Sequence, residues 1–133
     1  MDKHTFMILV KTKIGPSKIN GIGLFANQFI PKGTLVQKFM PGFDLEISEN
    51  EIPKLSEPAR EQFLKYAYKN RDGHYILCFD DTRFLNHSDS PNLISNNPNE
   101  EIDIAAVDIQ KGDELTVNYK EFDADFDYKM SIY

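Results

Sequence analysis

Three short segments of the 133-residue sequence combine residue types that could hold a ligand or take part in chemistry. The first, residues 20–26, reads Asn-Gly-Ile-Gly-Leu-Phe-Ala, and its glycines, Gly21 and Gly23, let the backbone bend and approach a ligand closely before a strand resumes. It is not a dinucleotide-binding fingerprint, because no third glycine follows at the required offset and no helical pattern continues from it. Taken alone, the segment is also typical of a plain loop before a strand.

The second segment, residues 83–92, reads Arg-Phe-Leu-Asn-His-Ser-Asp-Ser-Pro-Asn and is dense in side chains that hydrogen-bond to backbone groups. Ordinary turns rarely concentrate so many of them. Asn86 can both donate and accept, which suits a ligand that carries an amino group and a carboxylate. His87 can add backbone or ring contacts, although for a histidine taken alone a structural hydrogen bond is the favoured explanation.

The third segment, residues 111–119, reads Lys-Gly-Asp-Glu-Leu-Thr-Val-Asn-Tyr and predicts a turn followed by a strand that ends in Tyr119. On spacing alone, a simple hairpin with a packed aromatic side chain explains it best.

The elements that must position these segments are mainly short strands, because short apolar or alternating runs recur between turn signals rich in Gly, Pro and Asn. The expected strands are Phe6–Val10, Gly23–Ala26, Thr34–Phe39, Tyr75–Phe79, Ile102–Ala106 and Leu115–Tyr119. One helix is expected to begin near Ser56, which can cap it, and to stop between Asn70 and Gly73. Its aromatic residues, Phe63 and Tyr66, are assigned to packing. The prediction is a mainly β domain with one or two short helices.

Composition predicts one folded domain over residues 1–133, with 41% hydrophobic residues and no linker at which to divide the chain. A net charge of -6 argues against general nucleic-acid binding and favours basic proteins or peptides as partners. The single cysteine, Cys78, excludes an internal disulfide, and no secretion signal of the standard type or membrane span is seen. We therefore expect a protein of the cytoplasm or nucleus, in an unknown oligomeric state.

Together and in this order, the segments resemble the SET-domain family of protein lysine methyltransferases, whose members carry a GxG turn, an asparagine-histidine-serine motif ending in Pro-Asn, and a late ELT-x-x-Tyr strand. In this sequence these stand at residues 21–23, 83–92 and 114–119, and the resemblance spans about residues 15–120. It implies a fold of small curved β-sheets with a knot-like late segment that tucks under residues 83–92. It also implies methyl transfer from S-adenosylmethionine to a lysine of a protein, with histones or other basic proteins as substrates.

The resemblance carries residue roles onto matching positions. It places Gly21, Ile22, Gly23 and Leu24 at the methionine end of the cofactor, Asn86 at its polar groups and His87 at its adenine side. Tyr119 matches the family's active-site tyrosine, next to both cofactor and lysine. Physically, a phenol there can orient the amine in line with the sulfonium methyl.

A lysine channel is expected from Met40, Tyr75 and, in a possible aromatic lid over residues 121–133, Phe122, Phe126 and Tyr128. Peripheral packing of those tail aromatics remains open. Met40 stands where many relatives have a tyrosine and cannot donate the corresponding hydrogen bond, which leaves open the number of methyl groups added. The chain has no cysteine-rich zinc-binding tail, and no metal is expected.

Two other functions fit parts of the sequence. The first is a catalytically inert module of this fold that binds a basic peptide, which the Met40 substitution favours. The second is a cysteine hydrolase using Cys78, His87 and Asp89, although Cys78 lies in an apolar strand, where a buried inert thiol is usual.

Overall fold

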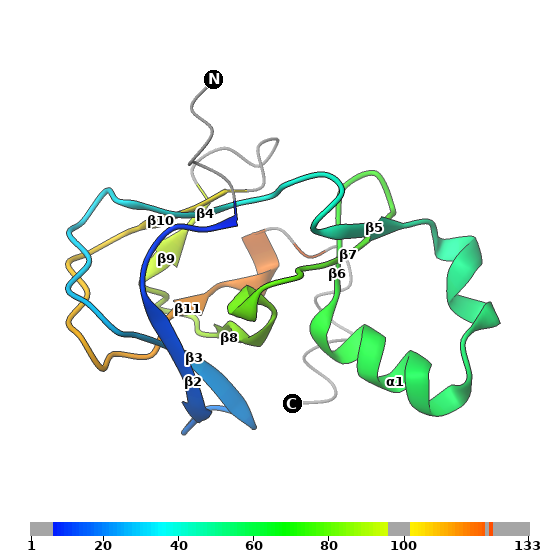
Figure 1. Cartoon of the computed structure of the whole chain (residues 1–133), viewed down its shortest axis with the longest axis horizontal. Coiled ribbons are helices and arrows are strands. Elements are labelled where there is room, and N and C mark those ends of the chain that lie inside the picture. Colours follow the sequence, from blue (N-terminus) through cyan, green and yellow to red (C-terminus); the bar gives the residue numbers. More distant parts are fainter. Residues whose placement is uncertain (1–6, 96–101, 122, 124–133) are drawn as a thin grey trace.

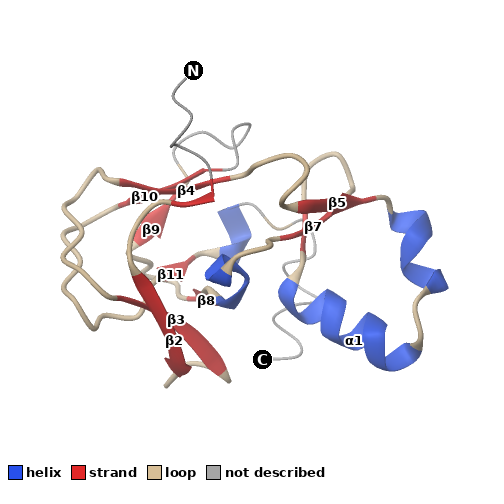
Figure 2. Ribbon diagram, viewed as in Figure 1, coloured by secondary structure: helices blue, strands red, loops and turns tan. Residues whose placement is uncertain are grey.

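The computed structural model of the chain describes residues 7–95, 102–121 and 123, which form short strands and few helices (Figures 1 and 2). The strands are β1 (Met7–Ile8), β2 (Thr12–Pro16), β3 (Ile22–Ala26), β4 (Leu35–Lys38), β5 (Leu45–Ile47), β6 (Tyr68–Lys69), β7 (Tyr75–Leu77), β8 (Asn86–His87), β9 (Leu93–Ile94), β10 (Ile102–Ala105) and β11 (Thr116–Val117). The helices are α1 (Glu57–Tyr66) and the 3-10 helices η1 (Glu49–Lys54), η2 (Asp81–Phe84) and η3 (Tyr119–Glu121). The predicted fold of small β-sheets is confirmed.

The strands form four small sheets. One has the order β1-β4-β10-β9, a second is the hairpin β2-β3, and a third has the order β5-β7-β6. These three are antiparallel, whereas β8 and β11 form a parallel pair. Figure 1 shows this pair in the middle of the molecule, between the β2-β3 hairpin and α1.

Two hydrophobic clusters hold the sheets together. The main cluster joins β3, β4 and β10 to the residues before η3; its fully buried members are Leu24, Ala26, Ile30, Val36, Leu93, Ala105, Ile109 and Leu115. The second packs α1 on the β5-β7-β6 sheet, where the Phe63 and Tyr75 rings meet edge to face at 6.0 Å. Phe63 therefore packs as the sequence predicted.

The predicted helix begins correctly and ends too late. The Ser56 side chain accepts a hydrogen bond from the Ala59 amide at 3.3 Å, so it caps α1 as expected. The helix ends at Tyr66, because the next residues leave the helical conformation and Tyr68 and Lys69 pair with β7. Sheet pairing thus overrides the helical pattern beyond Tyr66. No helix among the described residues is both long and apolar enough to cross a bilayer.

A buried carboxyl lies in the largest sheet and makes stability depend on pH. Asp103 of β10 faces Gln37 of β4, whose Nε2 donates to Asp103 Oδ2 at 2.9 Å. Burial, with a smaller contribution from the Glu121 carboxylate, raises the Asp103 pKa from 3.8 to about 6. The folded state therefore holds this proton more tightly than the unfolded state, so the free energy of unfolding falls as pH rises from about 4 to about 6.

Asp103→Asn is expected to remove this dependence while keeping an acceptor for Gln37. Above pH 6 the variant should be more stable than the wild type, by at most about 3 kcal/mol for a shift of roughly two pKa units. Below pH 4 the two should converge. Urea unfolding at pH 4, 5, 6 and 7.5 measures the difference, and a gap that does not change with pH would contradict the assignment.

Candidate functional site

Two motifs that are distant in the sequence meet in the parallel pair at the centre of the fold. Thr116 and Val117 of β11 lie opposite Asn86 and His87 of β8, and the Ser88 amide donates to the Val117 carbonyl at 2.9 Å. Residues 114–119 thus run directly beside residues 83–88.

The asparagine at the end of the second motif holds the other edge of the same strand. Asn92 Nδ2 donates to the Glu114 carbonyl at 2.8 Å, and Asn92 Oδ1 accepts from the Thr116 amide at 2.8 Å. Successive residues of a strand point their backbone groups to opposite edges. Asn92 therefore binds the edge of β11 that faces away from β8. The late strand is therefore enclosed from both edges by residues 86–92, which is the knot-like arrangement expected from the sequence.

Tyr119 lies two residues after β11, at the start of η3, and is held against β8. Its hydroxyl donates to the Leu85 carbonyl at 2.6 Å, and its amide donates to His87 Nδ1 at 3.1 Å. The Tyr119 side chain is buried, with 8% of its surface exposed. These bonds fix the position of the phenol relative to the asparagine-histidine motif.

His87 is buried and hydrogen-bonded through both ring nitrogens. Because a backbone amide can only donate, Nδ1 must accept from Tyr119, and the ring proton therefore sits on Nε2. Nε2 then donates to Asp89 Oδ1 at 2.9 Å. In this structure His87 orients the Tyr119 segment, and its expected contact with an adenine ring stays a prediction.

Asn86 connects β8 to the glycine-containing loop before β3. Its Nδ2 donates to the Asn20 carbonyl at 3.0 Å and to the Ile22 carbonyl at 3.3 Å. All three predicted segments are thus in contact. The expected bond of Asn86 to a cofactor stays a prediction, since its amide nitrogen is engaged by the loop itself.

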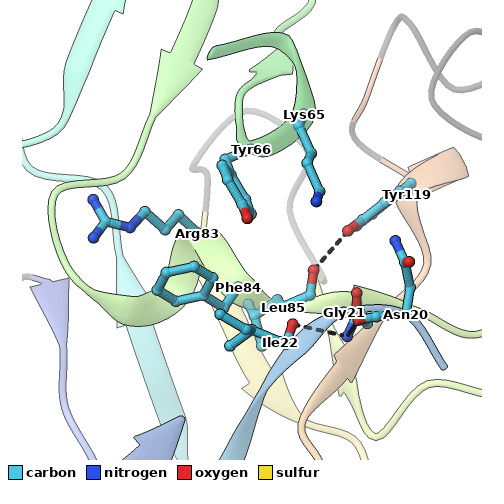
Figure 3. Close-up of a pocket in the computed structure, with 10 residues that line it drawn as sticks. Asn20, Gly21, Ile22, Lys65, Tyr66, Arg83, Phe84, Leu85 and Tyr119 are labelled. Carbon is cyan, nitrogen blue, oxygen red and sulfur yellow. Dashed lines mark hydrogen bonds between the residues drawn. The ribbon is translucent and has the colours of Figure 1, made fainter. Parts of the chain in front are cut away.

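A pocket lies where these segments meet (Figure 3). Including the part open to solvent, it has a volume of about 310 Å³. Its walls are Asn20, Gly21, Ile22, Lys65, Tyr66, Arg83, Phe84, Leu85, Asn86 and Tyr119. In Figure 3, Lys65 and Tyr66 reach from the end of α1 toward Tyr119, and the Arg83 side chain points away from it.

Aromatic and basic side chains line the side of the pocket opposite the loop. The Tyr66 and Phe84 rings meet edge to face, with centroids 5.4 Å apart. Cations lie over both rings, with Lys65 Nζ 5.4 Å from the Tyr66 centroid and the Arg83 guanidinium carbon 5.0 Å from that of Phe84. The pocket therefore offers aromatic surface and positive charge together.

Six wall residues were not among the site residues expected from the sequence: Asn20, Lys65, Tyr66, Arg83, Phe84 and Leu85. Tyr66 was assigned to packing because aromatics at helical spacing are usually core. Its position as the last residue of the helix, with Phe63 and Leu64 already facing the second cluster, is the signal that could have separated it. Arg83 and Phe84 belong to the second motif, but no ligand contact was predicted for either of them.

The two described residues that were expected to form a lysine channel, Met40 and Tyr75, lie in other parts of the fold. Met40 begins a turn in which its carbonyl accepts from the Phe43 and Asp44 amides, and Tyr75 lies in the second hydrophobic cluster. Neither lines the pocket described above. Phe122, Phe126 and Tyr128 lie outside the described residues, so the lid stays a prediction.

The described residues argue against cysteine hydrolase chemistry. Burial, with added repulsion from Asp44, Asp80 and Asp103, raises the pKa of Cys78 to about 12, although a hydrogen bond to Thr82 opposes the shift. The thiol is therefore protonated at neutral pH, whereas the nucleophile in such enzymes is the thiolate. Within residues 7–95, 102–121 and 123, no group of three or more His, Cys, Asp or Glu side chains is placed to hold a metal ion.

Comparison with known sequences gives one family. The model of the SET domain matches residues 21–120. The chain is 28% identical over 121 residues to the histone-lysine N-methyltransferase trr of Drosophila melanogaster, covering 78% of this chain and 4% of the relative. It is 30% identical over 121 residues to the human histone-lysine N-methyltransferase 2D, covering 84% of this chain and 2% of the relative. The chain thus spans a very small part of these relatives.

Solved structures share the fold. A proposed histone methyltransferase of Plasmodium falciparum superposes with a TM-score of 0.58 at 26% identity, covering 84% of this chain and 95% of that chain. The Polycomb Repressive Complex 2 of Chaetomium thermophilum, in an autoinhibited conformation bound to S-adenosylmethionine, gives a TM-score of 0.61 at 24% identity, covering 92% of this chain and 17% of that chain.

Proposed function

Because the chain belongs to the SET-domain family, we propose that it transfers a methyl group from S-adenosylmethionine to the side-chain amine of a lysine in a protein. The observation that carries the proposal is the parallel pairing of β8 with β11, which places Tyr119 in the wall of a pocket opposite the glycine-containing loop.

The pocket lining offers contacts for the base, the sulfonium and the carboxylate of S-adenosylmethionine. The Tyr66 and Phe84 rings offer surface for a flat base or a sulfonium cation, which aromatic faces attract. Lys65 offers the positive charge that a carboxylate requires. We infer that these residues, with the loop at residues 20–22 and Asn86, hold the cofactor, which when bound supplies an electrophilic methyl group on a positively charged sulfur.

Tyr119 can orient the amine that receives the methyl group. Its phenolic proton is donated to the Leu85 carbonyl, so its oxygen presents lone pairs to any group entering the pocket. An amine N–H held by this oxygen leaves the nitrogen lone pair directed elsewhere, as attack on a methyl group requires. The lysine must first lose a proton, and apolar surroundings lower a lysine pKa in that direction. We propose that water accepts this proton.

A basic protein is the proposed substrate. The net charge of -6 attracts basic chains, and the curated relatives are named for histone lysines. We accordingly propose an intracellular site of action, in the cytoplasm or the nucleus. We also propose that residues 1–133 act as one catalytic domain.

Incubation with isotope-labelled S-adenosylmethionine and a panel of histones and other basic proteins, followed by mass spectrometry, tests the proposal. Label on a lysine side chain is the expected result. Titration calorimetry separates the alternatives: heat with the methyl donor but no transfer would favour an inert module of this fold. The absence of both would overturn the assignment.

A further inference from the structure

Beneath the glycine-containing loop lies a carboxylate that is not part of the pocket wall. Glu114, the residue before Leu115, shares the single hydroxyl proton of Ser17 between its two oxygens, each 2.9 Å from Ser17 Oγ. Its Oε2 also accepts from Asn86 Nδ2 at 3.0 Å. One side chain therefore connects the turn of the β2-β3 hairpin to the second motif.

Ser17 organises the turn that precedes the pocket wall. Its Oγ accepts from the Ile19 amide at 2.9 Å and from the Asn20 amide at 3.3 Å, while its own amide donates to the Gly21 carbonyl at 2.9 Å. With both amides donating to Oγ, the hydroxyl proton is directed to Glu114. The turn is thus closed around a hydroxyl that the carboxylate orients.

Asn86 holds the same stretch from the other end. It donates to the carbonyls of Asn20 and Ile22, and its amide nitrogen also contacts Glu114. The pocket wall at residues 20–22 is therefore fixed by two side chains, Ser17 and Asn86, and both of them are bound to Glu114.

Gly23 leaves the space in which this carboxylate lies. A Cβ atom at position 23 would stand 2.5 Å from Glu114 Oε2 and 3.0 Å from Ser17 Cβ, both closer than atoms can approach without displacement. The second glycine of the turn thus has a use within the protein: it admits Glu114 under the loop.

We propose that Glu114 is a positioning residue that sets the affinity for the methyl donor by fixing the pocket wall at residues 20–22 through Ser17 and Asn86. This rests on the proposed function and adds a residue to it. The chemistry calls for a carboxylate, which only accepts hydrogen bonds and here meets donors at both oxygens. Because Glu114 acts through the loop and not on the reacting atoms, the methyl-transfer step itself should change little in its absence.

Glu114→Gln tests this with almost no change in volume. The new amide group must face either Asn86 Nδ2, another donor, or Ser17 Oγ, which already accepts from two amides. We expect the Kd of the methyl donor, measured by calorimetry, to rise on the order of tenfold, as leaving a partly buried polar group unsatisfied does. At saturating donor, kcat should stay within about threefold.

Ser17→Ala and Glu51→Gln complete the design. Ser17→Ala should raise the Kd in the same direction and speed hydrogen exchange of the Ile19 and Asn20 amides, a readout that needs no ligand. Glu51→Gln makes the same chemical change on η1, where the carboxylate pairs with exposed Lys54 at 3.0 Å, and should alter neither quantity.

Three outcomes separate this inference from the proposed function. If the wild type binds the donor and both variants of the Ser17–Glu114 pair bind it equally well, the inference is wrong and the function stands. If kcat falls with no rise in Kd, Glu114 does not act by positioning the donor site. If the wild type binds no donor, the function fails, and unchanged exchange at Ile19 and Asn20 would overturn the role of Glu114 in holding the loop.

Discussion

Replacing Tyr119 with phenylalanine is expected to lower kcat by roughly 100-fold or more, the usual cost of removing one preorganised polar group from a reacting centre. The substitution removes the oxygen that we propose accepts from the amine, together with the hydrogen bond to the Leu85 carbonyl. The ring, its burial and the amide bond to His87 remain, so the fold should survive with a loss of about 1 kcal/mol.

The measurement is single-turnover methyl transfer at saturating cofactor, with the Kd of S-adenosylmethionine determined in parallel. A fall in rate with a nearly unchanged Kd is the pattern of a group that acts on the amine. Tyr68→Phe, the same change on β6 and outside the pocket wall, serves as the control and should be close to the wild type. A fully active Tyr119→Phe protein would refute the orienting role.

Gly23→Ala is expected to weaken binding of the methyl donor by roughly 100-fold and to destabilise the fold by about 1 to 3 kcal/mol, the range for overpacking a filled site. The added methyl group would meet Glu114 Oε2 at 2.5 Å and its Cδ at 2.9 Å. Either the carboxylate or the loop must move, and both movements break the contacts of Ser17 or Asn86 that hold residues 20–22.

Gly15 provides a matched control within the same hairpin. It lies directly opposite Gly23 in the β2-β3 register, and a Cβ there would meet nothing closer than the Phe25 ring at 3.7 Å, an ordinary contact. Gly15→Ala should therefore bind the donor as the wild type does. Calorimetry gives the Kd of the donor and thermal unfolding gives the stability of both variants. Equal effects of Gly15→Ala and Gly23→Ala would mean that general disturbance of the hairpin, and not the approach of Glu114, is responsible.

The sequence predicted strands that have a strong local pattern and missed others, among them the five-residue β2 and strands that exist only through pairing. Residues 75–77 and 102–105 are apolar and flanked by turns, so their strands were expected. By contrast, β6 and β8 are two residues long, and nothing in so short a run distinguishes a strand from a loop. Residues 68–69 and 86–87 are strands because they pair with β7 and β11.

For the site, the recognised motifs pointed to Asn86, His87 and Tyr119, because the family's residues stand at fixed offsets within each motif; of these, Asn86 and Tyr119 line the pocket, and their roles stay predictions. The residues contributed by α1, Lys65 and Tyr66, carry no such signature, and their place depends on where the helix ends against β7. The bonds between Glu114 and Ser17 join positions 97 residues apart and are equally invisible in a local pattern. What escaped prediction is therefore set by tertiary contacts and not by residue type.

The enclosure of β11 by residues 86–92 also sets an order of assembly during protein synthesis. Residues 7–95 leave the ribosome first, so the β2-β3 hairpin and the β5-β7-β6 sheet can form on a nascent chain that still lacks residues 114–119. The side-chain bonds of Asn92 and the ladder of β8 must wait for this strand, since their partners are residues 114–117. We therefore expect insertion of this strand to be the slow final step of folding, with ligand binding acquired at that same moment.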